Sequence, residues 1–152
     1  MCIRDRWIQL WYSFTTAGNA ANVVTVNYGG SVDTESIGVE QFSHASGRYD
    51  VEGNGDIASD IILTMSMHAT SAASNLLFTS TKSFNSRTQT VYDANWTKFA
   101  SGSTFHTFSW RVVTDSASYN GGININTASN ITGVYAVFTE ASSGGNLAWI
   151  TA

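Results

Sequence analysis

Short runs in which apolar and polar residues alternate recur along this chain, whereas the 3.6-residue period of an amphipathic helix is almost nowhere to be found. The strongest runs are residues 8–14, 23–28, 61–68, 104–113 and 134–140. Side chains on a strand point alternately to opposite faces, so each run predicts a strand with one apolar face. The residues predicted to share that face are Ile61, Leu63, Met65 and Met67 in the run 61–68 and His106, Phe108, Trp110 and Val112 in the run 104–113.

Shorter or less regular runs of the same kind predict further strands, at residues 36–42, 76–78, 88–92, 96–99 and 123–125. The strand at residues 7–14 is expected to form a hairpin with residues 23–28 around the turn at 17–19, with residues 47–60 a polar loop and 119–122 a turn. About eight to ten strands with no crossover helix between them predict an all-β fold, an antiparallel β-sandwich or jelly roll.

Composition agrees with a folded, weakly charged domain. Hydrophobic residues make up 43% of the 152 residues, enough for a core, but charged residues make up only 12%, about half the usual share. Small uncharged polar residues must therefore solvate much of the surface. Proline is absent, so turns with special backbone angles must use Gly or Asn.

The two ends of the chain differ from its middle. Residues 1–6, Met-Cys-Ile-Arg-Asp-Arg, resemble translated adapter sequence at the start of metagenomic open reading frames and are interpreted as a non-native leader. Residues 7–140 are expected to be the β domain, and residues 141–152 a Gly/Ser linker with a terminal segment that is a candidate final strand. The single cysteine, Cys2, lies in the leader, so no disulfide framework is expected.

Charge and motifs argue against several functions. The net charge of −4 with scattered Lys and Arg gives no footprint for nucleic acid, and no apolar run is long enough to span a membrane. There is no Gly-x-Ser-x-Gly motif, and His44, His68 and His106 have no metal-site spacing. Nothing places the carboxylates Asp33, Glu35 and Glu40 across a cleft. We therefore expect a protein that is not an enzyme and has no cofactor, calcium being the one candidate.

The candidate calcium ligands lie in and beside the predicted polar loop. Oxygen-bearing side chains at alternating positions, with glycines between them, are similar to the first half of a calcium-binding loop. A glutamate at the twelfth position is missing, since Ile61 stands there. The alternative is a solvated acidic turn set by Asn54-Gly55. The candidate metal ligands are Asp50, Glu52, Asn54, Asp56 and Asp60.

Five tryptophans raise the possibility of a carbohydrate-stacking platform. Trp7 and Trp11 share a predicted strand face with Gln9 and Ser13, so they are the candidate ligand-binding residues. Trp110 alternates with apolar residues, which is typical of a core position. Core filling or a subunit contact is the competing interpretation for the aromatic residues as a group.

Several motifs resemble those of exported and phage-borne β-sandwich domains. An aliphatic-Trp-Tyr strand is followed by a Gly turn, a Val-Thr-Val strand and a break of small residues; a Ser-Trp strand and a Tyr-Ala-Val-Phe strand come later. The chain departs from that pattern in lacking proline in the first turn and in its longer acidic segment near Asp50. The residues that carry the resemblance are 10–14, Gly18, 24–31, 39–42, 109–111 and 135–138.

The resemblance implies a Greek-key domain of a phage structural or tail-associated protein, or of a secreted bacterial protein, and supplies no catalytic residues. The leading expectation is a structural or adhesion module of a bacteriophage virion, located on the particle or extracellularly. Its expected partners are other virion or surface proteins and further copies of itself, because sandwich edges are often covered by other subunits. The alternative is a carbohydrate-binding module of a secreted bacterial protein that recognises a cell-surface glycan. A third possibility, a glycan-hydrolase fragment, would need two carboxylates facing one groove.

Overall fold

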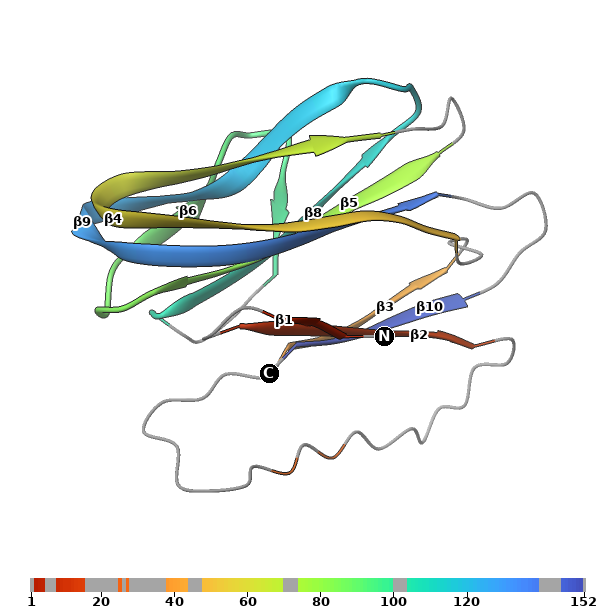
Figure 1. Cartoon of the computed structure of the whole chain (residues 1–152), viewed down its shortest axis with the longest axis horizontal. Helices are drawn as coiled ribbons and strands as arrows, with labels where there is room; N and C mark the ends of the chain where they lie inside the picture. The colour runs from red at the N-terminus through yellow and green to blue at the C-terminus, as the bar shows by residue number, and fades with distance from the viewer. Residues whose placement is uncertain are drawn as a thin grey trace.

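The computed structural model describes residues 2–4, 8–15, 25, 27, 38–43, 48–69, 74–99, 104–139 and 146–151, and side chains at 8, 25, 27, 53–69, 74–99 and 104–139. These residues form ten strands and no helix (Figure 1), so the all-β prediction is confirmed. All the strand pairings are antiparallel. The strands are β1 (Cys2–Arg4), β2 (Gln9–Thr15), β3 (Gly38–Ser43), β4 (Arg48–His68), β5 (Asn75–Ser83), β6 (Gln89–Val91), β7 (Thr97–Lys98), β8 (His106–Val113), β9 (Ser118–Thr139) and β10 (Asn146–Thr151).

A four-stranded sheet with the order β1-β2-β10-β3 brings the two ends of the chain together. The expected hairpin of residues 7–14 with 23–28 is wrong: β2 pairs with β1 and β10, and Thr25 and Asn27, the described residues of the second run, are exposed and outside any strand. Residues of the predicted leader supply β1, and the terminal segment supplies β10.

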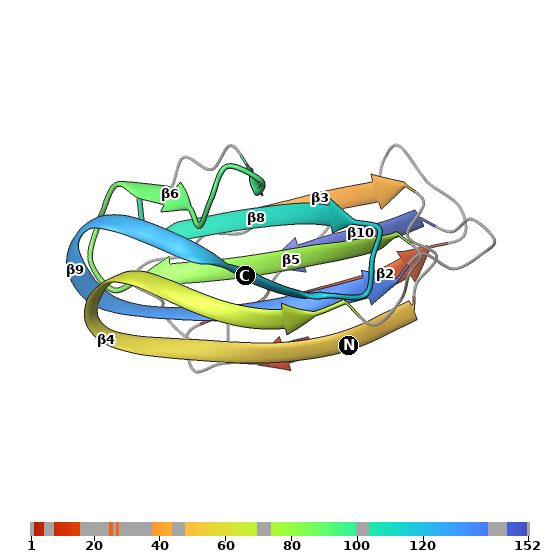
Figure 2. The same ribbon diagram turned by 90° about the horizontal axis from the view of Figure 1, so that it is seen from above.

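The second sheet has six strands, ordered β4-β9-β5-β8-β7 with β6 on β9, and is dominated by the long ribbon of β4 and β9. Register shifts interrupt this ribbon between Ile57 and Ile62, where both strands bend at the same end (Figure 2). We call the part beyond the bend, residues 62–68 of β4 with 118–124 of β9, the return arm; it folds back over the rest of the sheet (Figure 1). The predicted loop at 47–60 and the predicted turn at 119–122 are both wrong, since residues 48–60 and 119–122 are strand.

Glycines permit this ribbon because large side chains pack directly on its backbone. A Cβ at Gly121 would lie 2.5 Å from both Met67 Cε and Trp96 Cζ2. Gly122 has φ +144°, and a Cβ there would lie 2.0 Å from the carbonyl oxygen of Leu63. Only glycine adopts that backbone conformation at little cost. These residues therefore mark close packing within a strand, where composition alone favoured a turn.

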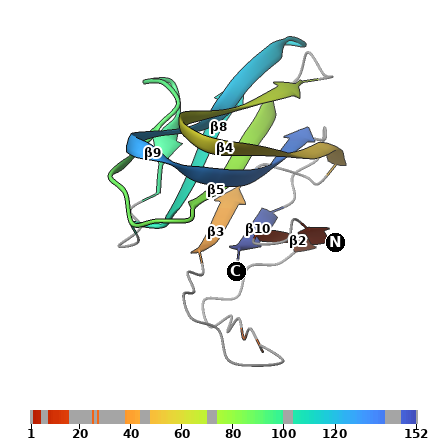
Figure 3. The same ribbon diagram turned by 60° about the vertical axis from the view of Figure 1, so that its left-hand side comes forward.

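Three hydrophobic clusters form the described core. Two lie between the return arm and the remainder of the six-stranded sheet, and the third lies on the opposite face of β5, β8 and β9, where it includes Ile8 from the segment before β2. That face is turned toward the four-stranded sheet (Figures 1 and 3). The clusters are cluster A (Ile8, Leu76, Phe78, Phe108, Val134, Ala136, Phe138), cluster B (Met67, Ala69, Leu77, Trp96, Val113, Val137) and cluster C (Leu63, Met65, Ile123, Ile125, Ile131).

The predicted strands at 61–68 and 104–113 are present in β4 and β8, with differences at particular residues. In β4, Leu63, Met65 and Met67 are buried as expected, but Ile61 is 47% exposed because it lies in the irregular bend. In β8, Val112 is 50% exposed, whereas Thr107 and Ser109 are buried because cores lie on both faces of this strand. The sandwich or jelly-roll arrangement of the two sheets stays a prediction.

Candidate functional site

The candidate calcium ligands lie along the first part of β4, up to and within its bend. Asn54 and Asp56 are exposed on the strand, and the Oδ1 of Asp60, also exposed, accepts a hydrogen bond from the Ile61 N–H at 2.6 Å. Asp50 and Glu52 belong to β4, but their side chains lie outside the described residues. Alternate residues of a strand are about 6.8 Å apart, so an extended strand arranges ligands in a row. Among the described residues, no three His, Cys, Asp or Glu side chains are grouped so that they could hold a metal ion.

The tryptophans separate into core residues and residues whose side chains are not described. Trp96 is buried in cluster B and donates its Nε1–H to the carbonyl oxygen of Asn120 at 3.1 Å. Trp110 is half-buried against cluster A, in agreement with the core interpretation. Trp11 lies in β2 opposite Ile150, with its side chain outside the described residues, as is the whole of Trp7. The aromatic platform therefore stays a prediction.

His106 is a core residue, the default interpretation of its sequence position. It is 5% exposed, and its ring is stacked on that of Phe108 at a centroid distance of 6.3 Å. Burial, with a smaller contribution from the charge of Lys82, lowers the pKa of His106 to about 4. The residue is therefore neutral near pH 7 and cannot act there as a cation.

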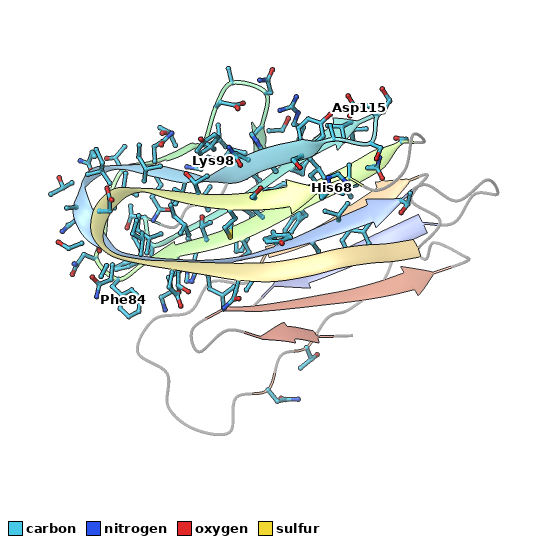
Figure 4. All side chains as sticks on the ribbon, turned by 45° about the horizontal axis from the view of Figure 1, so that its top comes forward. His68, Phe84, Lys98 and Asp115 are labelled. Carbon is cyan, nitrogen blue, oxygen red and sulfur yellow. The ribbon has the colours of Figure 1, made fainter. Side chains whose placement is uncertain are left out.

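His68 takes part in a contact that the sequence did not reveal. Its Nδ1 lies 3.1 Å from the Oγ of Ser118, its partner in the β4–β9 ladder. Both residues are exposed, and they form the last pair of the return arm, farthest from the bend; Figure 4 labels His68. Fifty residues separate them along the chain, so only the strand register could have predicted the pair. Because both side chains are exposed on the sheet surface, the pair is a surface hydrogen bond and lacks the enclosed site that a Ser-His nucleophile needs. His44, and Asp33 and Glu35 of the carboxylate set, lie outside the described residues, and of Glu40 only the backbone, in β3, is described.

A second surface cluster lies beside that pair. The hydroxyl of Tyr119 donates a hydrogen bond to the carboxylate of Asp115, and the guanidinium of Arg111 lies 4.8 Å from the centre of the Tyr119 ring. The hydrogen bond to Asp115 raises the pKa of Tyr119. The cluster fixes the connection between β8 and β9 where the return arm begins.

The interior of the six-stranded sheet contains a polar network centred on Gln89. Its Nε2 donates to the Oγ of Ser83 and to the carbonyl oxygen of Thr104, each at 2.8 Å, and its Oε1 accepts from the Thr107 hydroxyl at 2.5 Å. Farther along β5 and β8, the hydroxyls of Thr79 and Ser109 are 2.7 Å apart. The network satisfies polar groups that the sheet buries, so its role is structural.

The outer side of the return arm is the most distinctive surface among the described residues. No Asp, Glu, Lys or Arg occurs in residues 61–68 or 116–139. The ladder pairs Ile62 with Asn124, Ser66 with Asn120 and His68 with Ser118. All of these are exposed except Asn124, which is half-buried. We call these residues, together with the exposed Thr64, the arm face.

Hydrogen bonds and close packing hold the arm face in place. Asn124 donates through Nδ2 to the carbonyl oxygens of Val91 and Tyr92 at 3.0 and 2.9 Å, which ties β9 to the end of β6. On the inner side, Leu63, Met65 and Met67 pack into clusters B and C. An uncharged surface on a rigid support is suited to contact with another surface.

No family model matches the chain, and neither does any curated protein or solved structure with which it was compared. In the part of the chain that the structure describes, no helix is both long and apolar enough to cross a membrane.

Proposed function

We propose that this chain is a non-enzymatic module that acts through surface contacts, as a structural or adhesion part of a bacteriophage particle. The observation that carries the proposal is the arm face, a surface without Asp, Glu, Lys or Arg that is made of Ile62, His68 and short polar side chains and packs on clusters B and C.

The chemistry of that surface favours contact with another macromolecule. Removing a charge from water costs far more than removing a hydroxyl or an amide that finds a partner. Interface centres are accordingly depleted in charged residues. Described charges border the return arm at Asp60 and Asp115 and over the Tyr119 ring at Arg111, and others lie on or near β6 and β7, at Arg87, Asp93 and Lys98. This distribution supports contact through the arm face with a polar rim around it.

The virion assignment is tested on phage particles isolated from a sample in which the gene is detected. Particles banded in a density gradient are digested, and peptides of this chain are sought by mass spectrometry. We expect its peptides to co-sediment with capsid and tail proteins, and genes for such proteins to flank its own. Peptides found only in the soluble secreted fraction, beside genes for glycan degradation, would refute the assignment.

The alternative function is carbohydrate binding by a secreted bacterial protein. The hydroxyl and amide groups of Thr64, Ser66 and Asn120 on the arm face are also suited to a polyhydroxylated ligand, and Trp7 and Trp11 remain its predicted stacking residues. A glycan array distinguishes the two functions. Binding that Trp11→Ala abolishes, in a variant with an unchanged melting temperature, would favour the alternative, and an array without hits would oppose it.

A further inference from the structure

One edge of the return arm has backbone groups available for pairing. In the described part of the chain β4 pairs with β9 alone, so its second edge has no ladder partner there. The Ala69 N–H donates to the carbonyl oxygen of Ala117 on the β9 side at 2.9 Å, and the Leu63 carbonyl oxygen lies against Gly122 of β9. Backbone groups alternate in direction along a strand. The N–H and C=O groups of Ile62, Thr64, Ser66 and His68 therefore point to the open edge.

The two halves of β4 differ in how they protect that edge. Residues before and within the bend include Arg48, Asp50, Glu52, Asp56 and Asp60, and charges of this kind discourage edge-to-edge pairing. Residues 61–68 carry none, and they contain neither proline nor glycine. The register shifts at the bend separate the protected half from the unprotected one.

We propose that a second copy of this chain pairs with this edge, as an antiparallel ladder of residues 62–68 with residues 62–68 of the other copy. Residues whose backbone groups point outward must pair with one another. Within 62–68 the longest two-fold register pairs Ile62 with His68, Thr64 with Ser66, and Met65 with its own counterpart. That ladder would add about eight backbone hydrogen bonds.

The distribution of charge along β4 favours self-pairing at residues 62–68 over self-pairing at residues 50–56. The register brings no like charges together, and it leaves Asp60 beyond the end of the paired segment. Self-pairing of residues 50–56 would instead bring carboxylates of the two copies close together, at a cost in free energy. In the proposed dimer the two arm faces become one continuous uncharged surface, with Thr64 beside Ser66 of the other copy.

The inference rests on the proposed function only in taking the chain to act by surface contact. Absence of the chain from phage particles would refute the virion assignment and leave the dimer standing. A monomeric chain found on phage particles would refute the dimer alone.

The first experiment is sedimentation equilibrium of the full chain and of two double-lysine variants. Thr64→Lys/Ser66→Lys places lysines opposite each other across the proposed ladder, whereas Thr88→Lys/Thr90→Lys makes the same change at exposed positions on and beside β6. We expect the wild type and the β6 control to be dimeric and the edge variant to dissociate at least about tenfold more readily, since like charges directly opposite are destabilising. Circular dichroism must show that all three chains are folded.

The second experiment tests the register. In a Cys2→Ser background, which removes the single cysteine of the chain, Met65→Cys places a thiol opposite its own counterpart, at the Cα separation of about 4.5 Å expected for a non-hydrogen-bonded pair. Met67→Cys is the matched control, because residue 67 lies opposite residue 63. We expect mild oxidation to cross-link the first variant and not the second. A wild-type chain that stays monomeric at about 100 µM, equal cross-linking of both variants, or unchanged dimerisation of the edge variant would overturn the proposal.

Discussion

Burial of His106 makes the stability of the domain dependent on pH in the mildly acidic range. The residue is 5% exposed, stacked on Phe108, and directly opposite Lys82 in the ladder between β5 and β8. Protonating it in the folded state would place a cation in an apolar layer beside a lysine. Its pKa of about 4 in the folded protein compares with 6.5 for an unperturbed histidine.

The sign and size follow from linkage. Between pH 6.5 and pH 4 the unfolded chain binds a proton at residue 106 that the folded chain does not bind, so the free energy of unfolding falls as the pH falls through this range. Each pH unit between the two pKa values is worth about 1.4 kcal/mol. The whole interval therefore lowers the free energy of unfolding by about 3 kcal/mol, and the loss levels off below pH 4.

Urea unfolding, followed by tryptophan fluorescence, measures this effect between pH 8 and pH 4 in the wild type and in His106→Phe. The variant keeps an aromatic ring beside Phe108 but cannot take up a proton. A constant difference in stability between the two proteins reflects packing, so the informative quantity is the change in that difference with pH. We expect the wild type to lose about 3 kcal/mol relative to the variant on acidification. Parallel pH profiles for the two proteins would refute the reasoning.

Three further predictions follow from the described contacts. Lys82→Met removes the neighbouring charge, so the His106 pKa measured by NMR titration should rise above about 4 while staying below 6.5, and an unchanged value would show that Lys82 has no influence. Gly122→Ala should lower the free energy of unfolding, measured with urea, by about 2–4 kcal/mol, because residue 122 has φ +144° and its Cβ would meet the Leu63 backbone. Gly133→Ala should lower it by less, since the nearest atoms to its Cβ would be in the side chains of Leu63 and Met65. The reverse order of the two effects would contradict the packing described. Gln89→Leu should cost about 2–4 kcal/mol by leaving buried partners such as Ser83 and Thr107 without their hydrogen bonds, and a cost no larger than that of the exposed control Thr90→Ala would argue against the network.

The alternation of apolar and polar residues predicted which side chains are buried where a strand has one buried face. Leu63, Met65 and Met67 alternate with exposed residues, so a period of two is visible in the sequence and survives in the structure. In β5 the pattern fails because both faces are buried, and Thr79, Thr81 and Ser83 are enclosed by hydrogen-bonded neighbours that no local pattern indicates.

Glycine residues are the reason that a loop and a turn were wrongly predicted within the two long strands. Asn54-Gly55 and Gly121-Gly122 have the composition of turns, but they lie within β4 and β9. A Cβ at Gly53 would be 2.6 Å from the ring of Tyr135, a residue far away in the sequence. Glycine is required at these positions because residues distant in sequence pack against the backbone there, and those contacts form only in the folded chain. The arm face was missed for the same reason, since the sequence gives no sign that residues 62–68 and 118–124 lie side by side.

The β4–β9 ribbon also has a consequence for how fast the chain reaches its native state. Its pairing runs from His68 with Ser118, fifty residues apart, to Arg48 with Thr139, which are still farther apart in sequence. The first pair of this ladder to form must therefore close a long loop, which costs conformational entropy before many contacts are made. Proteins dominated by such non-local pairs fold slowly. Pairing that starts at the His68 end closes the shortest loop and lets each later rung form beside one already made. The intervening strands β5 and β8 pair across a shorter separation, from Lys82 with His106 to Asn75 with Val113, so they are expected to organise first and to act as the template on which the ribbon closes.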